Sequence, residues 1–425
     1  MRIKAVRGTK DILPEEAQTW SLIEQQAKRL CALYGYREIR TPILEEASLF
    51  SRSIGASSDI VRKEMYAFAD RKNRLLCLRP EATASVVRAY LEHNLDKNLA
   101  LAKLYYLGPM FRAERPQAGR LRQFHHIGAE AIGSASPYLD AEIILLAINI
   151  LRSLGVEGWK LRYNSLGCQK DRAAYKIILE DKLKDKLRLL CADCHDRYKL
   201  NILRIFDCKN PECKKVIRLL PGIDASLCAS CAENYGNVER TLQVNISPKN
   251  VLARSPHLVR GLDYYTGTCF EITHGDLGAQ NALGAGGRYD NLVSDLGGPE
   301  KPAVGFALGV ERLIAVLSAK KEVQPPCVYL ATLGPEAKQI GFKLLSDLRK
   351  QGIPAETDYL NKSLKGQLRQ ADRLQVKMAA ILGEQELTKG TIILRNMQTK
   401  LQKEIKIGQL PEELKKCCAR IPAES

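Results

Sequence analysis

The chain has 425 residues, 45% of them hydrophobic, and this length suggests two to four domains with substantial cores. Its first residues, MRIKAVRGTKDILPEE, lack the apolar segment of a secretory signal, and no stretch reaches the roughly 18 consecutive apolar residues that a membrane span needs. Lysine and arginine outnumber aspartate and glutamate by 65 to 48, a net charge of +17. A chain this basic often binds a polyanion, nucleic acid first, although a solvated basic face gives the same composition.

Elements of the first third are predicted from the spacing of apolar residues. We expect helices at Trp20–Tyr34 and Ala84–Leu91, with a strand at Tyr36–Ile43 between them. Two further strands, Lys103–Phe111 and Gln123–Ile132, flank a polar loop rich in arginine. Strand, long basic loop and strand together predict an antiparallel hairpin with an extended tip.

A change of composition interrupts the middle of the chain. Residues Cys168–Cys231 are rich in lysine and cysteine, and we interpret them as a module inserted into a mixed sheet. A helix at Ala141–Leu154 and a strand at Trp159–Leu166 precede it. After it we expect strands at Leu258–Asp263 and Thr268–Thr273, a glycine-rich turn at Gly284–Arg288, and a strand that runs into a helix over Ala303–Leu317.

The last hundred residues predict a separate small domain. Glu322–Pro326 has the composition of a linker, and strands and helices alternate beyond it. This alternation is typical of an α/β domain on a mostly parallel sheet. The predicted elements are Cys327–Leu333 (strand), Pro335–Gln351 (helix), Pro354–Asp358 (strand), Lys362–Leu374 (helix), Lys377–Leu382 (strand) and Thr391–Asn396 (strand).

The 13 cysteines are an odd number in a large chain without a signal, which favours reduced cytoplasmic thiols over a disulfide framework. Three close pairs lie in the insertion. Paired C-x-x-C segments at this separation indicate zinc, and we expect a tetrahedral thiolate site formed by Cys191, Cys194, Cys228 and Cys231. The pair Cys208 and Cys213 is an alternative partner for the first pair, and free thiols in a helical insertion are the remaining interpretation.

The segment FRAERPQAGRLRQFHHIGAE (111–130) carries the densest set of polar groups. Arginine forks suit phosphate oxygens, because one guanidinium can give two parallel donors to one group. Phe124 could offer a flat face to a base. A solvated basic loop with a buried phenylalanine is the plain alternative. The polar side chains between the strands are Arg112, Glu114, Arg115, Arg120 and Arg122.

Two other segments place polar groups where a strand or helix begins. In RPEATASVVRAY (79–90), Glu81 and Thr83 could hold a ligand ammonium, although a helix cap explains them as well. In LVRGLDYYTGTCFEI (258–272), an apolar strand ends in a cluster of polar groups that need partners: Arg260, Asp263, Tyr264 and Tyr265.

Glycines recur in ALGAGGRYDNL (282–292) and PAVGFALGVERL (302–313), and they let a backbone approach a ligand closely. The spacing is not that of a dinucleotide-binding loop, and no βαβ context surrounds it. Arg312 follows the second glycine run at the start of a helix.

These segments together resemble the histidyl-tRNA synthetases, which are class II aminoacyl-tRNA synthetases. RGTKDILPEE (7–16) is similar to the family's opening segment, FRAERP with RQFHHIGAE to class II motif 2, and GFALGVERL to motif 3. RGLDYYTG (260–267) resembles the signature of the histidine enzyme, and this match is the specific one, since motifs 2 and 3 alone would indicate only class II.

The resemblance implies an α+β catalytic domain on a mixed, mainly antiparallel sheet of six to seven strands with flanking helices. A helical insertion and a C-terminal α/β anticodon-binding domain complete it. We expect the catalytic core at residues 1–167 and 241–321, the cysteine-rich insertion at 168–240, and the anticodon-binding domain at 326–425. The family further implies a homodimer built on the N-terminal segment.

Roles for single residues also follow from the resemblance. Arg112 would hold the α-phosphate of ATP and the histidine carboxylate, Glu114 the adenine amino group, and Phe124 the adenine ring. Arg312 would clamp the γ-phosphate end. Glu81 and Thr83 would bind the histidine ammonium, and Glu130 and Tyr265 the two imidazole nitrogens, with Tyr264 beside them. Arg260 would be the main electrostatic catalyst at the α-phosphate.

The chemistry that the family implies suits these residue types. The histidine carboxylate attacks the α-phosphorus of ATP and pyrophosphate leaves, so charge neutralisation by arginine and Mg²⁺ carries the step and no general base is needed. The adenylate is then transferred to the terminal adenosine of tRNA(His). Arg115, Gln117 and Arg120 at the loop tip would face the acceptor end of the tRNA.

One position departs from the family, which usually places glutamine where this chain has His126. A protonated ring would repel the histidine ammonium, so we expect weaker histidine binding at low pH than in relatives with glutamine. Three other interpretations compete: a catalytically inactive regulatory relative of the same fold, a class II synthetase for proline or threonine, and a basic RNA-binding protein. The C-terminal domain and the RGLDYY stretch argue against the regulatory relative. Glu130 with its tyrosines argues against a proline or threonine enzyme, and the complete arginine set argues against an RNA-binding protein without catalysis.

Overall fold

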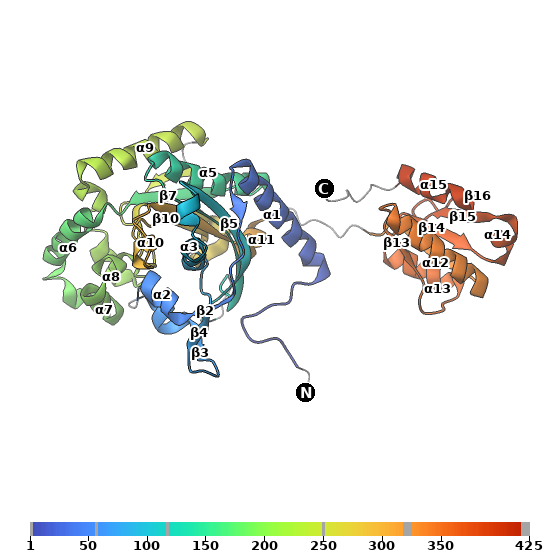
Figure 1. The fold of residues 1–425 in the computed structure, drawn as a ribbon, viewed down its shortest axis with the longest axis horizontal. Helices are drawn as coiled ribbons and strands as arrows, with labels where there is room; N and C mark the ends of the chain where they lie inside the picture. The colour runs from blue at the N-terminus through green and yellow to red at the C-terminus, as the bar shows by residue number, and fades with distance from the viewer. Residues whose placement is uncertain (1–2, 56–57, 116–118, 249–250, 318–324, 418–425) are drawn as a thin grey trace. The chain divides into compact units, whose positions relative to one another are not determined.

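The computed structural model describes residues 3–55, 58–115, 119–248, 251–317 and 325–417, and the chain divides into two compact units, Met1–Lys321 and Glu322–Ser425. Helices and strands of both units are drawn in Figure 1. No helix in these ranges is both long and apolar enough to cross a membrane.

The first unit is built on an eight-stranded sheet with the order β1-β5-β6-β11-β10-β9-β7-β8. The two edge pairs, β1 with β5 and β7 with β8, are parallel, and all other neighbours are antiparallel. The expected mixed, mainly antiparallel sheet is confirmed, but six to seven strands was too few, because short edge strands carry little sequence signal. The bounds are β1 Arg37–Glu38, β5 Ala102–Phe111, β6 Gln123–Ile132, β7 Trp159–Ser165, β8 Leu252–Arg254, β9 Thr266–His274, β10 Ala282–Arg288 and β11 Ala303–Gly309.

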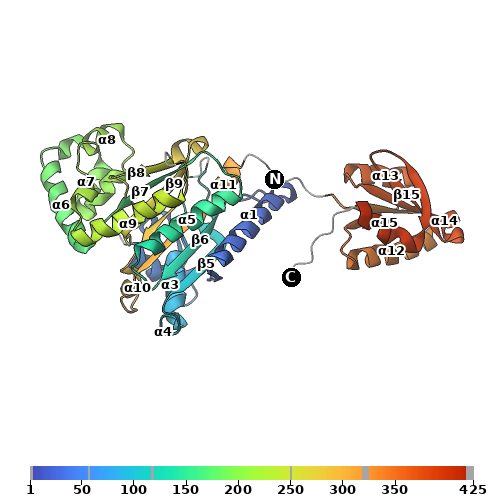
Figure 2. The same cartoon turned by 90° about the horizontal axis from the view of Figure 1, so that it is seen from above.

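Helices cover one face of this sheet. Figure 2 shows α9 (Ala229–Asn245), α5 (Pro137–Ser153) and α1 (Pro14–Leu33) in a row across it, and α5 contacts both neighbours. Apolar side chains from these helices and from alternate strand residues form the largest core. The helix α5 is apolar nearly all round because it lies between the sheet and its two neighbours.

The other face of the sheet packs against shorter elements. These are α2 (Ala47–Ser53), the π-helical turn Ile60–Glu64, α3 (Thr83–Glu92), α4 (Leu95–Asn98) and α10 (Leu292–Asp295), with a small sheet of β2 (Leu44–Glu46), β4 (Leu75–Leu78) and β3 (Tyr66–Ala69). Because these elements are short, part of this face is left uncovered around the β5–β6 hairpin, and the cavity described below lies there.

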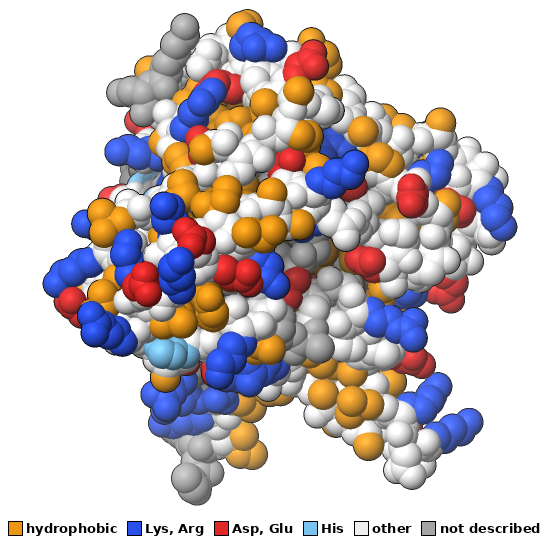
Figure 3. Space-filling view, turned by 90° about the vertical axis from the view of Figure 1, so that its left-hand side faces the viewer, with side chains coloured by type: hydrophobic (Ala, Val, Ile, Leu, Met, Phe, Trp, Pro, Cys, Tyr) orange, Lys and Arg blue, Asp and Glu red, His pale blue; other side chains and the backbone are white. Residues whose placement is uncertain are grey.

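The insertion is helical, as expected, and has a core of its own. Its elements are α6 (Gln169–Leu183), α7 (Ala192–Leu200) and α8 (Pro211–Ile217), with 3₁₀ turns at Leu187–Leu189, Ile202–Asp207 (η3) and Ile223–Ser226. They gather at one end of the first unit (Figure 1). Lysine and arginine side chains are spread over this end with acidic ones between them (Figure 3), so the view shows no continuous field of one sign.

Two sequence predictions in the first unit were wrong. Residues Leu258–Asp263 form no strand, because their backbone bends into a turn that is held by side chains of the insertion. Residues Gly284–Arg288 form no turn but lie in β10, where glycine is needed for a different reason: a Cβ on Gly286 would come within 2.2 Å of the carbonyl oxygen of Gly305 on the next strand.

The second unit has a five-stranded sheet with the order β13-β12-β14-β15-β16. The pairs of β12 are parallel, but β14 with β15 and β15 with β16 are antiparallel, so the expectation of a mostly parallel sheet was wrong. The polar edge strand β16 was not predicted. The bounds are β12 Val328–Thr332, α12 Pro335–Lys350, β13 Ala355–Thr357, α13 Leu364–Arg373, β14 Met378–Leu382, α14 Glu384–Lys389, β15 Thr391–Asn396, β16 Gln402–Lys406 and α15 Leu410–Cys417.

Cysteines in the described ranges are free thiols, as expected, except Cys327, which is disulfide-bonded. The expectation of reduced thiols throughout was therefore wrong at this one position.

Candidate functional site

A cavity of about 620 Å³ opens over the β5–β6 hairpin, a volume typical of small-molecule sites. It brings together side chains from segments that are far apart in the sequence. Among the residues predicted for the site, those that line it are Glu81, Thr83, Arg112, Glu114, Arg120, Phe124, His126, Glu130, Arg260, Tyr264, Tyr265 and Arg312. Arg115 lies exposed outside it, and Gln117 falls outside the described residues.

Strand alternation explains which side chains reach the cavity. Phe124, His126 and Glu130 occupy alternate positions of β6 and share one face, whereas Ile127 and Ala129 point to the helical core on the other. The neighbouring strands offer small residues on the same face, so the sheet leaves room for a ligand instead of filling the space with side chains.

Gly305 shows how tight this face is. It lies opposite Glu130 in the β6–β11 pairing, and a Cβ there would come within 1.7 Å of the Glu130 Oε2 atom. Gly305, which belongs to a glycine run noticed in the sequence as a place of close approach, thus makes space for the Glu130 carboxyl group itself.

Glu130 is the buried polar centre of the cavity, with 1% of its surface exposed. The Thr83 hydroxyl donates to its Oε1 over 2.7 Å, the Tyr106 hydroxyl lies 3.5 Å from the same atom, and the Tyr289 hydroxyl donates to its Oε2. Burial outweighs these bonds and raises the pKa of Glu130 to about 8. The carboxyl group therefore holds a proton at neutral pH.

Glu81 lies two residues before the helix α3 and lines the same cavity. Its two oxygens accept hydrogen bonds from the backbone N–H groups of Thr83 (2.7 Å) and Ala84 (2.9 Å), so it does cap the helix. Burial raises the pKa of Glu81 above its ordinary value. A carboxylate has about four lone-pair directions, so two of them remain for a ligand.

Three tyrosines form the wall beyond Glu130. The rings of Tyr264 and Tyr265 lie 4.7 Å apart, and Tyr264 meets Tyr289 edge-on at 5.6 Å. All three are buried, and burial raises the pKa of Tyr265 to about 12, so each phenol stays neutral and can donate one hydrogen bond.

Arg260 lines the cavity, and an ion pair fixes the position of its guanidinium group. Its Nη1 donates to Glu271 Oε1 over 3.0 Å, and Arg162 approaches the other oxygen of that carboxylate at 3.6 Å from the outside. Burial works against the charge, but Glu271 raises the pKa of Arg260 above its usual value. The Arg260 Nε atom is buried and has no hydrogen-bond partner among the described residues. A buried donor in this state favours an acceptor supplied by a ligand.

Further cations line the cavity, and one of them lies beside an aromatic ring. The Arg112 guanidinium lies 5.3 Å from the centre of the Phe124 ring and donates from Nε to the Pro80 carbonyl over 3.0 Å. Arg120 pairs with Glu114 at 2.7 Å. Arg312 donates to the carbonyls of Ala282 and Gly119 and remains at the rim.

His126 stays neutral in this setting. Burial, followed by the charges of Arg112 and Arg312, lowers the pKa of His126 to about 3. Its Nδ1 atom is buried and has no hydrogen-bond partner among the described residues. The lowered pKa of His126 argues against the expectation of weaker histidine binding at low pH, which stays a prediction for the binding measurement described below.

Three residues of the site were missed from the sequence. Tyr106 shares the cavity-facing side of β5, and the alternation of that strand could have identified it. Tyr289 follows the glycine run of β10, but no local pattern tells that it bonds to Glu130. Glu271 is likewise a strand residue whose pairing with Arg260 is set by the fold alone.

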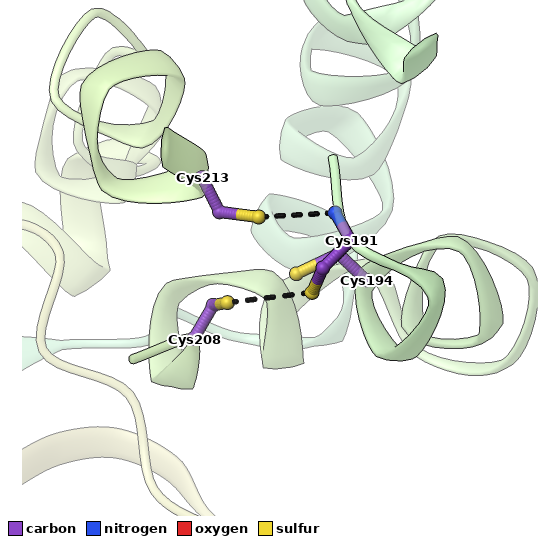
Figure 4. Close-up of side chains that lie close together, drawn as sticks. All are labelled: Cys191, Cys194, Cys208 and Cys213. Carbon is purple, nitrogen blue, oxygen red and sulfur yellow. Dashed lines mark hydrogen bonds between the residues drawn. The ribbon is translucent and has the colours of Figure 1, made fainter. Parts of the chain in front are cut away.

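The cysteines group differently from the principal expectation. Cys191 and Cys194 lie with Cys208 and Cys213 (Figure 4), the pairing that the sequence offered as the alternative. Cys228 and Cys231 lie instead with Cys168 and Asp171. The set Cys191, Cys194, Cys228 and Cys231 is therefore wrong as a single metal site, because η3 and α8 bring the middle pair to the first one.

Comparisons with known proteins agree over nearly the full length. The family model described as Histidyl-tRNA synthetase matches residues 8–313, and the one described as Anticodon binding domain matches 327–417. The chain is 48% identical over 414 residues to the histidine–tRNA ligase of Moorella thermoacetica, covering 96% of this chain and 97% of the relative. It is 46% identical over 417 residues to that of Desulfitobacterium hafniense, covering 97% of each.

Among solved structures, the chain is similar to the apo histidyl-tRNA synthetase of S. aureus. The two share a TM-score of 0.82 and 36% identity, over 97% of this chain and 100% of the other.

Proposed function

The chain belongs to the histidyl-tRNA synthetase family, and we propose that the cavity of its first unit is where histidine and ATP react. The function is that of a histidine–tRNA ligase, which activates L-histidine to histidyl-adenylate with release of pyrophosphate and transfers it to the 3′-terminal adenosine of tRNA(His). The roles of single residues are proposed from the resemblance to the family, and the geometry of the cavity supports them.

The observation that carries the proposal is the Glu130 carboxyl group, buried among hydroxyls and protonated at neutral pH. A protonated carboxyl can donate to one imidazole nitrogen, and the Tyr265 phenol bonds the other. The hydrogen bond between Glu130 and the imidazole ring contains one proton, and the bond is the same whether the carboxyl group or the ring carries that proton. Another amino acid would leave these buried groups unpaired, and such pockets discriminate by roughly 10⁴–10⁵ without editing.

The histidine ammonium needs acceptors, and the cavity supplies them next to Glu130. Glu81 has lone pairs free after capping α3, and Thr83 donates to Glu130 while its oxygen can still accept. The unpartnered Nδ1 of the neutral His126 is the third acceptor. This histidine therefore replaces the usual glutamine without adding a charge.

ATP is assigned to the end that holds Arg112, Phe124 and Arg312. Phe124 would stack on the adenine, with Glu114 at its amino group, while Arg112 meets the α-phosphate and Arg312 the γ-phosphate end. Mg²⁺ would neutralise charge on the phosphates, and Glu311, which lines the cavity, would offer it an oxygen ligand.

Catalysis then rests on position and charge. The histidine carboxylate carries no proton to remove, so the residues need only align it with the α-phosphorus and stabilise the negative charge that builds on the phosphate oxygens. Arg260 is assigned this role because Glu271 fixes its guanidinium while the buried Nε still needs an acceptor.

Further partners follow from the family. We propose that the second unit, which matches an anticodon-binding domain, contacts the tRNA anticodon, and that Arg115, Gln117 and Arg120 meet the acceptor end. We also propose a homodimer that works in the cytoplasm, where tRNA is charged.

The test is exchange of labelled pyrophosphate into ATP in the presence of histidine. Arg260→Ala should lower the exchange rate by about 10²–10³-fold, as loss of one preorganised charge at a transition state does. The matched control is Arg162→Ala, which removes the other arginine on Glu271 from outside the cavity and should keep most of the activity.

Equal losses in the two variants would refute the role of Arg260. No exchange by the folded wild type, with tRNA present, would favour the regulatory, non-catalytic relative instead.

A further inference from the structure

Four cysteines of the insertion converge on one point (Figure 4). Cys191 precedes α7 and Cys194 lies in its first turn, Cys208 follows η3, and Cys213 lies in α8. Their sulfur atoms all lie within 4.8 Å of one another, and Cys191 Sγ is 3.8 Å from Cys208 Sγ. Nothing in the proposed chemistry of the cavity uses them.

We propose that these four cysteines bind one structural zinc ion. Zinc–thiolate bonds of about 2.3 Å in a tetrahedron place the sulfurs about 3.8 Å apart, which is the Cys191–Cys208 distance. A disulfide would need about 2.05 Å, and all four thiols are free. Sulfurs this close enclose a single ion, and four thiolates in a tetrahedron favour zinc over metals that prefer oxygen ligands.

The backbone around the sulfurs is arranged as metal ligands require. The Cys194 N–H donates to the Cys191 carbonyl over 3.0 Å, which forms the C-x-x-C turn, and the Cys191 N–H donates to Cys213 Sγ over 3.1 Å. An N–H aimed at sulfur stabilises a thiolate. Three of the four cysteines are buried, and a full set of four protein ligands leaves no open position, as in structural zinc sites.

The segment between two of the ligands reaches the catalytic core. Asn201 donates to Asp263 Oδ1 over 2.9 Å, and Arg204 donates from Nη1 to the Gly261 carbonyl over 2.8 Å. Both lie between Cys194 and Cys208, so the metal would fix both ends of the segment that holds this turn. Arg260 stands at one end of the turn, and Tyr264 follows it. The link to catalysis rests on the proposed function, whereas the metal site does not.

The second cysteine group supplies a matched control. Asp171 is already engaged there: its carboxylate accepts from the backbone N–H of Cys168 over 3.2 Å and of Cys228 over 3.0 Å. Those bonds account for the closeness of Cys168, Asp171 and Cys228 without a metal. Cys231→Ser thus changes a cysteine of the same insertion outside the proposed site.

The test is metal analysis of the full-length protein, purified under reducing conditions without added zinc or chelator. We expect Cys208→Ser to bind about one equivalent of zinc less than the wild type, and Cys231→Ser to bind as much as the wild type. Less than a tenth of an equivalent in the wild type, iron in place of zinc, or a loss in Cys231→Ser with none in Cys208→Ser would overturn the proposal.

Removing a buried ligand can also unfold the insertion, so a second measurement uses the intact wild type. Release of zinc by a mercurial thiol reagent, followed with a metal indicator dye, should be accompanied by at least tenfold faster amide exchange over residues 191–213 and 261–263. Exchange in residues 327–417 should not change. Zinc release without a change in residues 191–213 would overturn the site. Zinc content is measured without any catalytic turnover, so the test of the metal site is independent of the pyrophosphate exchange that tests the proposed function.

Discussion

The variant Glu130→Gln should make the stability of the protein less dependent on pH. In the folded chain burial raises the pKa of Glu130 to about 8 from an ordinary 4.5, so the folded state keeps a proton that the unfolded state loses. The free energy of unfolding must then fall as the pH rises from 4.5 to about 8, by up to about 5 kcal/mol at 1.36 kcal/mol per pH unit. Glutamine has nearly the same shape and no proton to lose, so this loss disappears.

The assay is thermal unfolding without ligands at pH 5 and at pH 8.5. A difference in melting temperature between variant and wild type that is the same at both pH values reports the altered hydrogen bonds with Thr83 and Tyr289. Only the change in this difference from one pH to the other tests the protonation of Glu130. Between pH 5 and pH 8.5 this loss amounts to about 4 kcal/mol, so at roughly 2 °C per kcal/mol for a unit of this size the variant should gain up to about 8 °C relative to the wild type. The exposed Glu233→Gln on α9 is the control and should show no such gain. A difference that is equal at both pH values would refute the protonated state of Glu130.

Three further predictions concern the remaining parts of the site. His126→Gln should leave the pH dependence of the histidine Michaelis constant unchanged between pH 5.5 and 8, since the pKa of His126 is about 3; a rise below pH 6 in the wild type alone would contradict this. Gly305→Ala should lower histidine-dependent exchange at least tenfold because its Cβ meets Glu130, whereas Gly275→Ala, with open space around it, should not; equal rates would show that the strand adjusts. Arg115→Ala should weaken tRNA binding and reduce the slope of log affinity against log salt by about 1 while exchange without tRNA is kept, and an unchanged slope would remove Arg115 from the interface.

The sequence predicted the β5–β6 hairpin to within one residue, because its strands alternate clearly and the polar loop between them interrupts the pattern. The resemblance of this hairpin to class II motif 2 also pointed to Arg112 and Glu130, and both line the cavity. Elements whose backbone conformation is set by contacts with distant residues could not be predicted from the sequence. The segment Leu258–Asp263 looks like a strand locally, but Asn201 and Arg204 of the insertion hold it in a turn.

Partners across the sheet were also beyond the sequence. Tyr289 bonds to Glu130 on β6, and Glu271 pairs with Arg260 in the turn before β9. Nothing in the local sequence around either residue indicates these partners. The cysteine pairs show the same limit: their spacing indicated candidate metal ligands, but the turn η3 decides which pairs meet. The low pKa of His126 depends on burial and on Arg112 and Arg312 together, so its charge could not be inferred from residue type.

The most direct test of the central claim, that this cavity selects histidine and activates it with ATP, is pyrophosphate exchange by the purified wild type with each of the twenty standard amino acids in turn. We expect rapid exchange with histidine and, for every other amino acid, a rate lower by about 10⁴-fold or more. Comparable exchange with proline or threonine, or none with histidine, would contradict it.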